Sequence, residues 1–352
     1  MASATCVVTG GAGFIGCALS GGLGQRFKRV IALDSLHPQI HPTPARPAAL
    51  DASIELRHAD ITEPAIWDKL LATARPNVIV HLAAETGTGQ SLTESSRHAH
   101  VNVVGTTTML DALSRAKHVP DQLVLASSRA IYGEGAWRRS GGSVFYPGLR
   151  GRDQLEQGVW DFPAAEPLRS QAETTEPRPT SVYGATKLAQ EQILQAWAGA
   201  YGARLSILRL QNVYGPGQSL INSYTGIVSL FVRLAKENKS IPLYEDGGMR
   251  RDFVYIDDVA AALLSAIDAR PAGTVRFDIG TGDFATIRDI AAIISTRYGA
   301  PTPHVSAAFR HGDVRHAMCD ISHSLAHLQW SPRVSLQSGL NSLCDWIDSQ
   351  LP

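Results

Sequence analysis

Two side chains near the middle of the chain have the types and the spacing needed for proton transfer. Tyr183 is the only one of nine tyrosines that is followed by a lysine four residues later, at Lys187. On a helix this spacing places both side chains on one face, where the ammonium group can lower the phenol pKa from about 10 towards neutral pH. Tyr183 could then act as a general acid or base. Because one such pair is expected by chance in a chain of this length, its meaning depends on the surrounding elements.

A glycine turn near the start of the chain supplies that context. The stretch CVVTGGAGFIG, residues 6–16, predicts a short buried strand, a tight turn and the beginning of a helix. Its glycines satisfy G-x-G-x-x-G from Gly11 and a G-x-x-G-x-x-G variant from Gly10. Such glycines permit a tight turn, a close approach of a pyrophosphate to bare backbone, and close packing of helix on strand. We therefore predict cofactor contacts at Gly10, Gly13, Phe14, Ile15 and Gly16.

The next strand indicates which dinucleotide binds. RVIALD, residues 29–34, ends in Asp34, 18 residues after Gly16. A carboxylate there can accept hydrogen bonds from both hydroxyls of an adenosine ribose, and it would repel a 2′-phosphate. The sequence therefore favours NAD over NADP, with Lys28 and Arg29 nearby as the contrary signal.

Apolar strands alternate with helical segments from residue 5 to residue 128. Further strands are expected at 54–60, 77–84 and 122–128, and a helix at about 97–116. This alternation predicts an α/β fold with a doubly wound parallel sheet of the Rossmann type. Asp60 and Ile61 could hold an adenine edge, or Asp60 could cap the following helix. Ligands belong at the carboxyl ends of the strands, where we find the glycine turn, Asp34, Asp60, Ala83 and Ser128.

The regular pattern breaks between residues 134 and 180. This segment is rich in glycine, proline and arginine, yet it contains five aromatic residues, too many for a disordered linker. We expect an ordered insertion near the substrate. The predicted division is a dinucleotide-binding domain over 1–210 that carries this insertion, and a smaller mixed α/β substrate lobe over 211–352, with part of 250–285 returning to the first domain.

The composition limits the classes of partner. Lysine plus arginine equals aspartate plus glutamate, at 32 each, so no overall field attracts nucleic acid or an anionic membrane. The four cysteines form no C-x-x-C pair and are expected to be reduced core residues of a cytoplasmic protein. We expect neither secretion nor membrane insertion, because no charged-then-apolar leader and no apolar run near the roughly 18 residues of a membrane span can be recognised. The twelve histidines lack metal-ligand spacing, so no metal is expected.

The motifs, taken in order, resemble those of a known family. They are similar to the extended short-chain dehydrogenase/reductases, and among these to the NAD-dependent nucleotide-sugar epimerase/dehydratase family. The resemblance covers nearly the whole chain. It is carried by TGGAGFIG at 9–16, HLAA at 81–84, VNVVGTT at 101–107, SSRAIYG at 127–133, SVYGATK at 181–187, LRLQNVYGPGQ at 208–218, RDFVYIDDVA at 251–260 and RHGDVRH at 310–316.

This resemblance implies roles for the residues at matching positions. Ser128 would hydrogen-bond the sugar hydroxyl or ketone, and Tyr183 and Lys187 would complete the catalytic group. The implied cofactor is NAD, with further contacts from Asp34, Asp60, Ile61, Leu82, Ala83, Ala84, Asn102, Ser127, Tyr183 and Lys187. The implied substrate is a nucleotide-diphosphate sugar, bound by Thr86, Ser128, Arg129, Asn212, Arg251 and Arg310. A homodimer through helices at about 97–116 and 183–200 is also implied.

The residues after Ser128 help to choose the reaction. Dehydratases of this family carry an Asp-Glu pair directly after the catalytic threonine or serine, because a hydroxide leaving group must be protonated. Here Arg129 and Ala130 stand at those positions, which favours oxidation at C4 followed by hydride return, the reaction of a 4-epimerase. ETGTGQS at 85–91 and WDFP at 160–163 look most like dTDP-L-rhamnose 4-epimerases. The lysine that the general 4-epimerase pattern places near Thr86 is absent.

Two other functions are compatible with parts of this pattern. A one-way nucleotide-sugar 4-ketoreductase on the same scaffold would consume stoichiometric NAD(P)H. A non-catalytic sugar-nucleotide-binding protein would share the fold without needing the catalytic residues. The presence of Ser128, Tyr183 and Lys187 argues against this function.

Overall fold

The central element is a seven-stranded parallel sheet. The computed structural model describes residues 4–220 and 226–350, and the strand order in this sheet is β14-β9-β5-β4-β1-β2-β3. The order reverses between β1 and β4, which opens a crevice at the carboxyl ends of these strands. The predicted doubly wound fold is confirmed. The strands are β1 (Thr5–Thr9), β2 (Arg29–Asp34), β3 (Glu55–His58), β4 (Val78–His81), β5 (Gln122–Ser128), β9 (Arg204–Leu210) and β14 (Thr274–Ile279).

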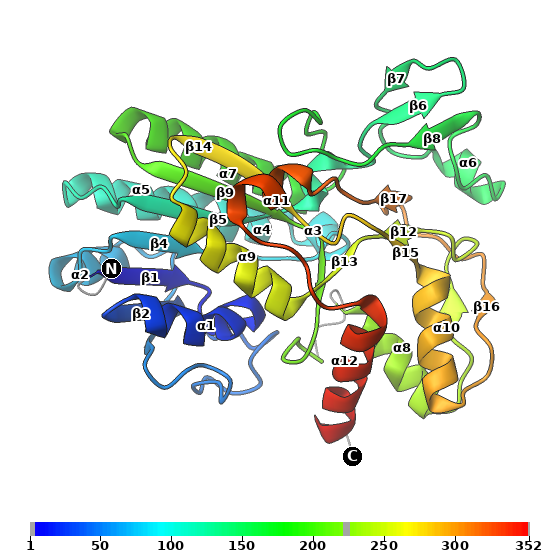
Figure 1. The fold of residues 1–352 in the computed structure, drawn as a ribbon, viewed down its shortest axis with the longest axis horizontal. Helices are drawn as coiled ribbons and strands as arrows, with labels where there is room; N and C mark the ends of the chain where they lie inside the picture. The colour runs from blue at the N-terminus through cyan, green and yellow to red at the C-terminus, as the bar shows by residue number, and fades with distance from the viewer. Residues whose placement is uncertain (1–3, 221–225, 351–352) are drawn as a thin grey trace.

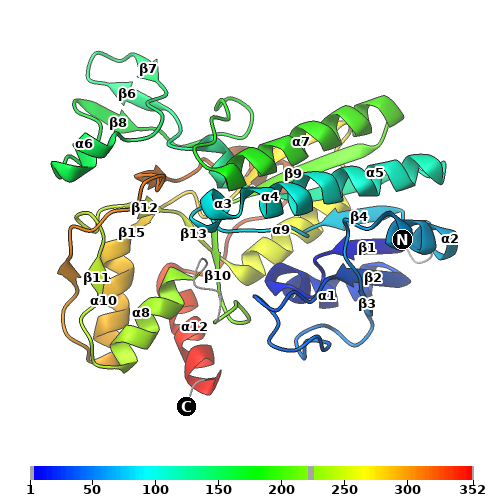
Figure 2. The same ribbon diagram turned by 180° about the vertical axis from the view of Figure 1, so that it is seen from behind.

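Helices cover both faces of this sheet, as Figures 1 and 2 show from opposite sides. One face is covered by α1 (Phe14–Arg26), α9 (Ile256–Ala269) and the shorter α11 (Ser322–Leu328). The other face is covered by α2 (Pro64–Thr73), α5 (Gly105–Arg115) and α7 (Val182–Tyr201). Both α9 and β14 follow residue 250 in the chain, so a late segment completes the main sheet. Among the described residues, no helix is long and apolar enough to cross a bilayer.

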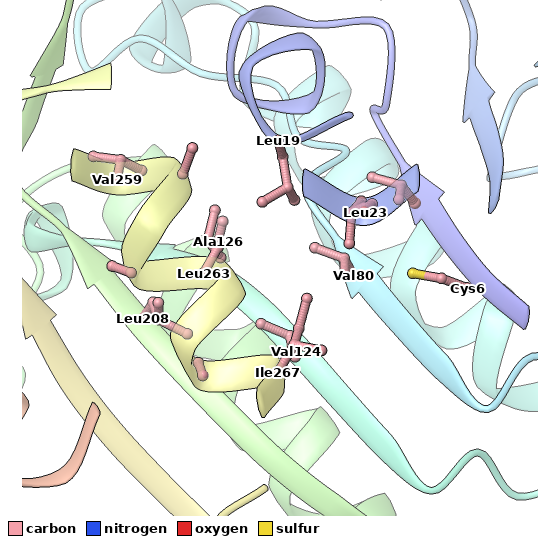
Figure 3. Packing of buried hydrophobic residues seen from close by; sticks show 14 of the residues in the cluster. Cys6, Leu19, Leu23, Val80, Val124, Ala126, Leu208, Val259, Leu263 and Ile267 are labelled. Atoms are coloured by element: carbon pink, nitrogen blue, oxygen red, sulfur yellow. The ribbon is translucent and has the colours of Figure 1, made fainter. Parts of the chain in front are cut away.

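Alternation along the strands produces one apolar core on each face. Cys6 and Val8 of β1 face the α1 and α9 side, whereas Val7 faces the α2 and α5 side. Figure 3 shows how the leucines of α1 and the apolar side chains of α9 meet over the strands β4, β5 and β9. Leu263 of α9 is fully buried there. All four cysteines are free thiols, and three of them are buried: Cys6, Cys319 and Cys344.

The insertion after residue 134 is an ordered small unit. It contains an antiparallel sheet in the order β7-β6-β8, built from β7 (Val144–Phe145), β6 (Trp137–Arg139) and β8 (Ala165–Pro167), and the short helix α6 (Arg152–Glu156). Trp137 is fully buried and meets the ring of Phe162 edge-on at 4.8 Å between ring centroids. In both ribbon views the insertion lies beyond the carboxyl ends of the main strands, and Figure 1 shows it near β17 (His316–Ala317).

A third apolar core lies among the later elements. It joins α8 (Ile227–Lys236), α10 (Ile287–Tyr298) and α12 (Leu336–Gln350). The accompanying strands form small sheets: β10 (Asn212–Tyr214) with β13 (Phe253–Tyr255), β11 (Pro242–Leu243) with β16 (His304–Val305), and β12 (Arg250–Arg251) between β15 (Ala285–Thr286) and β17. Of the predicted substrate lobe, residues 221–225 and 351–352 lie outside the described residues.

Candidate active site

The glycine turn after β1 leaves room for an anion at the start of α1. Gly10 has φ of +67°, and a Cβ there would come within 2.7 Å of the Ala83 backbone nitrogen. A Cβ on Gly16 would come within 2.5 Å of the Gly11 carbonyl oxygen. Helix α1 begins at Phe14 with Gly13 as its N-cap, without a capping side chain and without an acidic residue in its first turn. The first amide groups of α1 are therefore available to a phosphate.

Asp34 lies at the carboxyl end of β2, next to this turn. Its two oxygens accept hydrogen bonds from the Ala12 amide at 3.0 Å and the Leu36 amide at 2.9 Å, which fix the direction of the carboxylate. A carboxylate has about four acceptor positions, so Asp34 can still accept from ribose hydroxyls. The turn and Asp34 together fit an adenosine diphosphate group.

The alternatives left open for Asp60 and Ile61 are narrowed by their surroundings. Asp60 is exposed and accepts a hydrogen bond from the Thr62 amide at 2.8 Å, while α2 begins at Pro64. The Ile61 side chain belongs to the core beneath α2 and α5. Asp60 thus supports the local turn, and any contact from Ile61 to an adenine would come from its backbone.

Hydrogen bonds from Asn102 hold the loop that follows β4. The strand ends at His81, three residues earlier than expected, and is followed by the half-buried Leu82, Ala83 and Ala84. Asn102 accepts a hydrogen bond from the Glu85 amide at 2.8 Å and donates to the Glu85 carbonyl at 3.0 Å. It lies in the single π-helical turn η1 (His100–Val104), between α4 (Ser95–Ala99) and α5. Its second amide hydrogen goes to Thr186 on α7 at 2.9 Å, so Asn102 holds the loop against that helix.

Ser128 and Tyr183 come together between β5 and α7. Ser128 is the last residue of β5, and Tyr183 and Lys187 lie one turn apart in α7. Burial raises the pKa of the Tyr183 phenol above its usual range, while a hydrogen bond with Ser128 and the charge of Arg129 lower it. The ring of His98 from α4 meets the Tyr183 ring edge-on at 6.4 Å.

The Lys187 ammonium is held by a buried polar chain that sequence reasoning missed. Lys187 is 2% exposed, and its Nζ donates to Gln190 Oε1 at 2.5 Å. Gln190 donates onward to Thr106 at 2.9 Å, and His81 contacts both Thr106 and Thr9. Burial lowers the pKa of Lys187 to about 7, and burial with the nearby Lys187 charge lowers that of His81 to about 3. The only sequence signal was that Gln190 follows Lys187 by one helical turn.

Ser127 faces away from Ser128, into a second buried network. Its hydroxyl donates to Glu191 at 2.5 Å, and Glu191 pairs with Arg209 at 2.8 Å. Arg209 donates to the Tyr132 hydroxyl at 2.9 Å, and that hydroxyl donates to Asp278 at 2.9 Å. The predicted cofactor contact of Ser127 would therefore have to come from its backbone.

Two neighbouring cavities share the Arg129 side chain. One is also lined by Thr88, Ala130, Thr180, Ser181, Arg251, Gly312, Asp313 and Val314. The other is also lined by Tyr132, Gly133, Glu134, Gly135, Leu168, Ser170, Gln211, His316, Ala317 and Met318. The Arg129 Nε donates to Asn212 Oδ1 at 2.9 Å, and the Arg251 guanidinium donates to the Val314 carbonyl at 2.7 Å. Residues of the insertion, of the chain after residue 210 and of the turn that follows β5 thus all border this region.

The predicted substrate residues Thr86 and Arg310 do not line either of these cavities. Thr86 is not a lining residue of either cavity, and Thr88 takes that place. Arg310 is exposed, and its guanidinium lies over the Tyr244 ring at 5.1 Å from the centroid, outside the linings that contain Arg129 and Arg251. The described cavities therefore bring Arg251 together with Arg129 instead of with Arg310.

These features agree with a family comparison. The model of the family described as "NAD dependent epimerase/dehydratase family" matches residues 6–280. The chain belongs to the NAD dependent epimerase/dehydratase family. Among curated relatives, a dTDP-L-rhamnose 4-epimerase from Burkholderia thailandensis is 59% identical over 98% of this chain and 95% of its own length.

Solved structures of this family share the fold over the whole chain. A UDP-glucose 4-epimerase from Thermotoga maritima, solved with UDP-glucose, has a TM-score of 0.81 at 26% identity, covering 99% of this chain and all of its own. A UDP-glucose 4-epimerase from Thermus thermophilus in complex with NAD has a TM-score of 0.79 at 27% identity, with the same coverage. NAD is the family's cofactor, and the glycine turn with Asp34 fits its adenosine diphosphate half.

Proposed function

We propose that this protein is a nucleotide-sugar 4-epimerase that acts on a dTDP-6-deoxyhexose such as dTDP-L-rhamnose. The relative that is 59% identical over nearly the full length bears that name, which supports the sugar and the base. The observation that carries the reaction type is the meeting of Tyr183 with Ser128 beside Arg129 and Ala130. Because neither Arg129 nor Ala130 can donate a proton to a hydroxide leaving group, dehydration lacks its acid.

In the proposed reaction the side chains of this chain handle the proton. Bound NAD would supply the acceptor and donor of the hydride at C4. The Tyr183 phenolate oxygen takes the proton of the C4 hydroxyl as the ketone forms, and it returns that proton after the sugar has turned over. Ser128 hydrogen-bonds the same sugar oxygen, and Lys187 holds the nicotinamide ribose.

The remaining assignments form part of the same proposal. The nucleotide diphosphate is bound by Arg251, with Asn212 and Arg310, since guanidinium forks match phosphate oxygens. The two-part division at residue 210 and a cytoplasmic location also remain proposals. A homodimer is proposed through α4, η1, α5 and α7, where Val104 of η1 is 41% and Tyr201 of α7 is 50% exposed. Sedimentation velocity on the wild type tests this assembly.

The experiment that tests the reaction uses the protein as purified. We would incubate it separately with dTDP-L-rhamnose, dTDP-glucose, UDP-glucose and UDP-galactose, without added cofactor, and follow the products by NMR. The expected result is conversion of dTDP-L-rhamnose to its C4 epimer. A product that forms only with stoichiometric NAD(P)H would replace the epimerase with a reductase, and binding without turnover would replace it with a non-catalytic binder.

A further inference from the structure

A chain of buried polar side chains runs from the strand before the glycine turn to Lys187, and His81 lies in the middle of it. His81 is the last residue of β4, is 2% exposed, and is the register partner of Thr9 in β1. Its Nδ1 lies 2.7 Å from the Thr9 hydroxyl, and its Nε2 lies 2.9 Å from the Thr106 hydroxyl of α5. Both threonines are fully buried. Polar groups at this depth are costly without partners, so the direction of each hydrogen bond matters.

The contacts of Thr106 place the hydrogen on one side of the His81 ring. The Asn102 carbonyl oxygen, 2.6 Å away, can only accept, so the Thr106 hydroxyl donates to it. Thr106 therefore accepts from its two other neighbours, Gln190 Nε2 at 2.9 Å and His81 Nε2 at 2.9 Å. It follows that His81 Nε2 carries the hydrogen. The separation of 3.2 Å between Gln190 Nε2 and His81 Nε2 is then a contact between two donors.

The contacts of Thr9 agree with this assignment. With the hydrogen on Nε2, the bare Nδ1 of His81 accepts from the Thr9 hydroxyl, and Thr9 Oγ1 accepts from the Ala83 amide at 3.2 Å. Ala83 belongs to the loop that packs against the glycine turn, since a Cβ on Gly10 would come within 2.7 Å of the Ala83 nitrogen. Burial, and then the Lys187 charge, lower the pKa of His81 to about 3, so the ring is neutral.

At its other end the chain directs the Lys187 ammonium. Lys187 Nζ donates to Gln190 Oε1, and the fully buried Gln190 amide is oriented by Thr106, which accepts from its Nε2. If the amide turned over, it would present its NH2 group to the ammonium. An ammonium has three donors, so two remain for the groups beside Tyr183, including the ribose of the family's cofactor.

We propose that His81 is a positioning residue that holds two parts of the active site in register. Through Thr106 it directs the amide that holds Lys187, and through Thr9 it directs the loop after β4. The inference rests on the proposed 4-epimerase reaction, in which the ammonium must lie beside Tyr183. A neutral imidazole suits this place because it offers one acceptor and one donor without a charge that would repel the ammonium.

The tautomer of His81 tests the first step. Long-range proton–nitrogen NMR correlation in the purified enzyme, grown with nitrogen-labelled histidine, shows which ring nitrogen carries the hydrogen. The signal that is missing in His81→Gln identifies the residue. We expect hydrogen on Nε2 alone and no titration from about pH 5 to about pH 9. A hydrogen on Nδ1, or a ring that becomes charged in this range, would overturn the proposal.

Two half-replacements separate the two directions. His81→Asn keeps an acceptor near the Nδ1 position for Thr9 and loses the donor to Thr106, whereas His81→Gln keeps the donor and loses the acceptor. We expect His81→Asn to retain NAD while kcat per bound NAD falls about tenfold near neutral pH. We expect His81→Gln to lose NAD while kcat per bound NAD stays within about twofold. NAD content is measured after extraction from the purified protein. Equal losses of both quantities in the two variants would contradict the inference.

Thr106 provides a test that keeps the shape of the core. Thr106→Val removes the hydroxyl that orients the Gln190 amide, so the ascending limb of kcat should move to higher pH by about one unit as the ammonium supports the phenolate less. Thr106→Ser restores the hydroxyl and should move the limb by less than about 0.3 unit. The matched control is Thr108→Val on the same helix, where Thr108 is 8% exposed. A Thr106→Val profile that superimposes on the wild type would refute the role of the chain.

The comparison between the two half-replacements also guards against a loss of folding. Both change the same buried position, so general destabilisation would be common to both, whereas the proposal predicts losses of different kinds. If the wild type epimerises none of the sugars, the proposed function fails. The His81 tautomer and the NAD content of the two variants then still decide the inference.

Discussion

The core of the main sheet and the joint, where Glu134 and Arg150 of the insertion meet Glu245 and Arg315, are both buried, but the first is apolar and the second is charged. Between the sheet and its helices lie aliphatic side chains such as those of Leu19 and Leu263. At the joint lie charges: the side chains of Arg150, Glu134 and Glu245 are each 1% exposed, and Arg150 meets Glu245 at 2.7 Å. Apolar contacts are non-directional, whereas buried charges require particular partners. We therefore expect the sheet core to tolerate substitution by apolar residues of similar volume, whereas loss of one charge at the joint leaves its buried partner unpaired.

The joint extends over three segments that are far apart in the chain. Arg315 pairs with Glu245 at 3.0 Å, with Asp246 at 2.7 Å and with Asp161 of the insertion at 3.1 Å. Glu134 accepts hydrogen bonds from the Arg315 amide at 2.9 and 3.0 Å. Because Glu134 also lines a cavity with Arg129, the position of the insertion is coupled to the proposed substrate site.

The largest expected effect concerns the chemistry assigned to the sheet side. Tyr183→Phe should reduce turnover by on the order of 10³-fold, because the proposed proton acceptor is lost. The sugar nucleotide should bind as before, since neither the core nor the joint changes. Product formation is measured by NMR and binding by calorimetry. Turnover close to that of the wild type would remove Tyr183 from the mechanism.

The next largest effect should come from breaking the joint. Arg150→Met removes the buried ion-pair partner of Glu134 and leaves Glu245 with Arg315 alone, so it is expected to cost about 3–5 kcal/mol of unfolding free energy. Sugar-nucleotide affinity should fall while the NAD content of the purified protein is kept. Urea denaturation and cofactor extraction measure the two quantities. The matched control is Arg152→Met, whose side chain is 73% exposed, and it should change stability by less than about 0.5 kcal/mol.

A cavity in the sheet core should show the reverse pattern. Leu263→Ala removes a fully buried side chain of α9 and is expected to cost about 3 kcal/mol, with a larger effect on NAD retention than on sugar-nucleotide affinity. The control is Leu325→Ala on α11, where the side chain is 42% exposed. If Arg150→Met and Leu263→Ala each reduced NAD retention and sugar-nucleotide affinity to the same extent, the joint and the sheet core would not be energetically distinct.

The smallest effect is a change in the pH dependence of stability. Burial raises the pKa of Asp278 to about 7, against roughly 4 in an unfolded chain, although Tyr132 and Arg209 oppose the shift. Its contribution to stability is therefore full below pH 4 and is lost as the pH rises through 7. Asp278→Asn should gain about 2–3 kcal/mol relative to the wild type between pH 5 and pH 8. Thermal melts across this range measure it, with the exposed Asp111→Asn as a flat reference.

The main sheet could be predicted from the sequence because each of its strands has a local sequence pattern. The run RVIALD coincides with β2, and the mainly apolar run QLVLASS, residues 122–128, coincides with β5. Parallel strands buried on both faces produce such continuous apolar runs. The spacing of Tyr183 and Lys187 likewise placed both residues on α7, because helical periodicity is set by the backbone.

The insertion and the cavity residues could not be reached in this way. Strands of two or three residues, such as Val144–Phe145, are too short for any periodicity. Arg150 pairs with Glu245, which lies 95 residues later in the sequence. The sequence pattern around a charged residue does not indicate which distant charged residue it will contact. For the same reason the sequence could not predict which arginine lies near Arg251. We expected Arg310, but the residue that lines the same cavity as Arg251 is Arg129, and Arg310 lies over the Tyr244 ring.

The late arrival of β14 has a consequence for synthesis of the chain. The strand pairs with β9 over six residue pairs, from Thr274 with Leu205 to Ile279 with Leu210. Until the ribosome has made these residues, β9 presents an unpaired edge, and the apolar face awaiting α9 stays open to solvent. We therefore expect the nascent chain to expose this strand edge and this apolar face to solvent, because the sheet closes only after β14 has been translated.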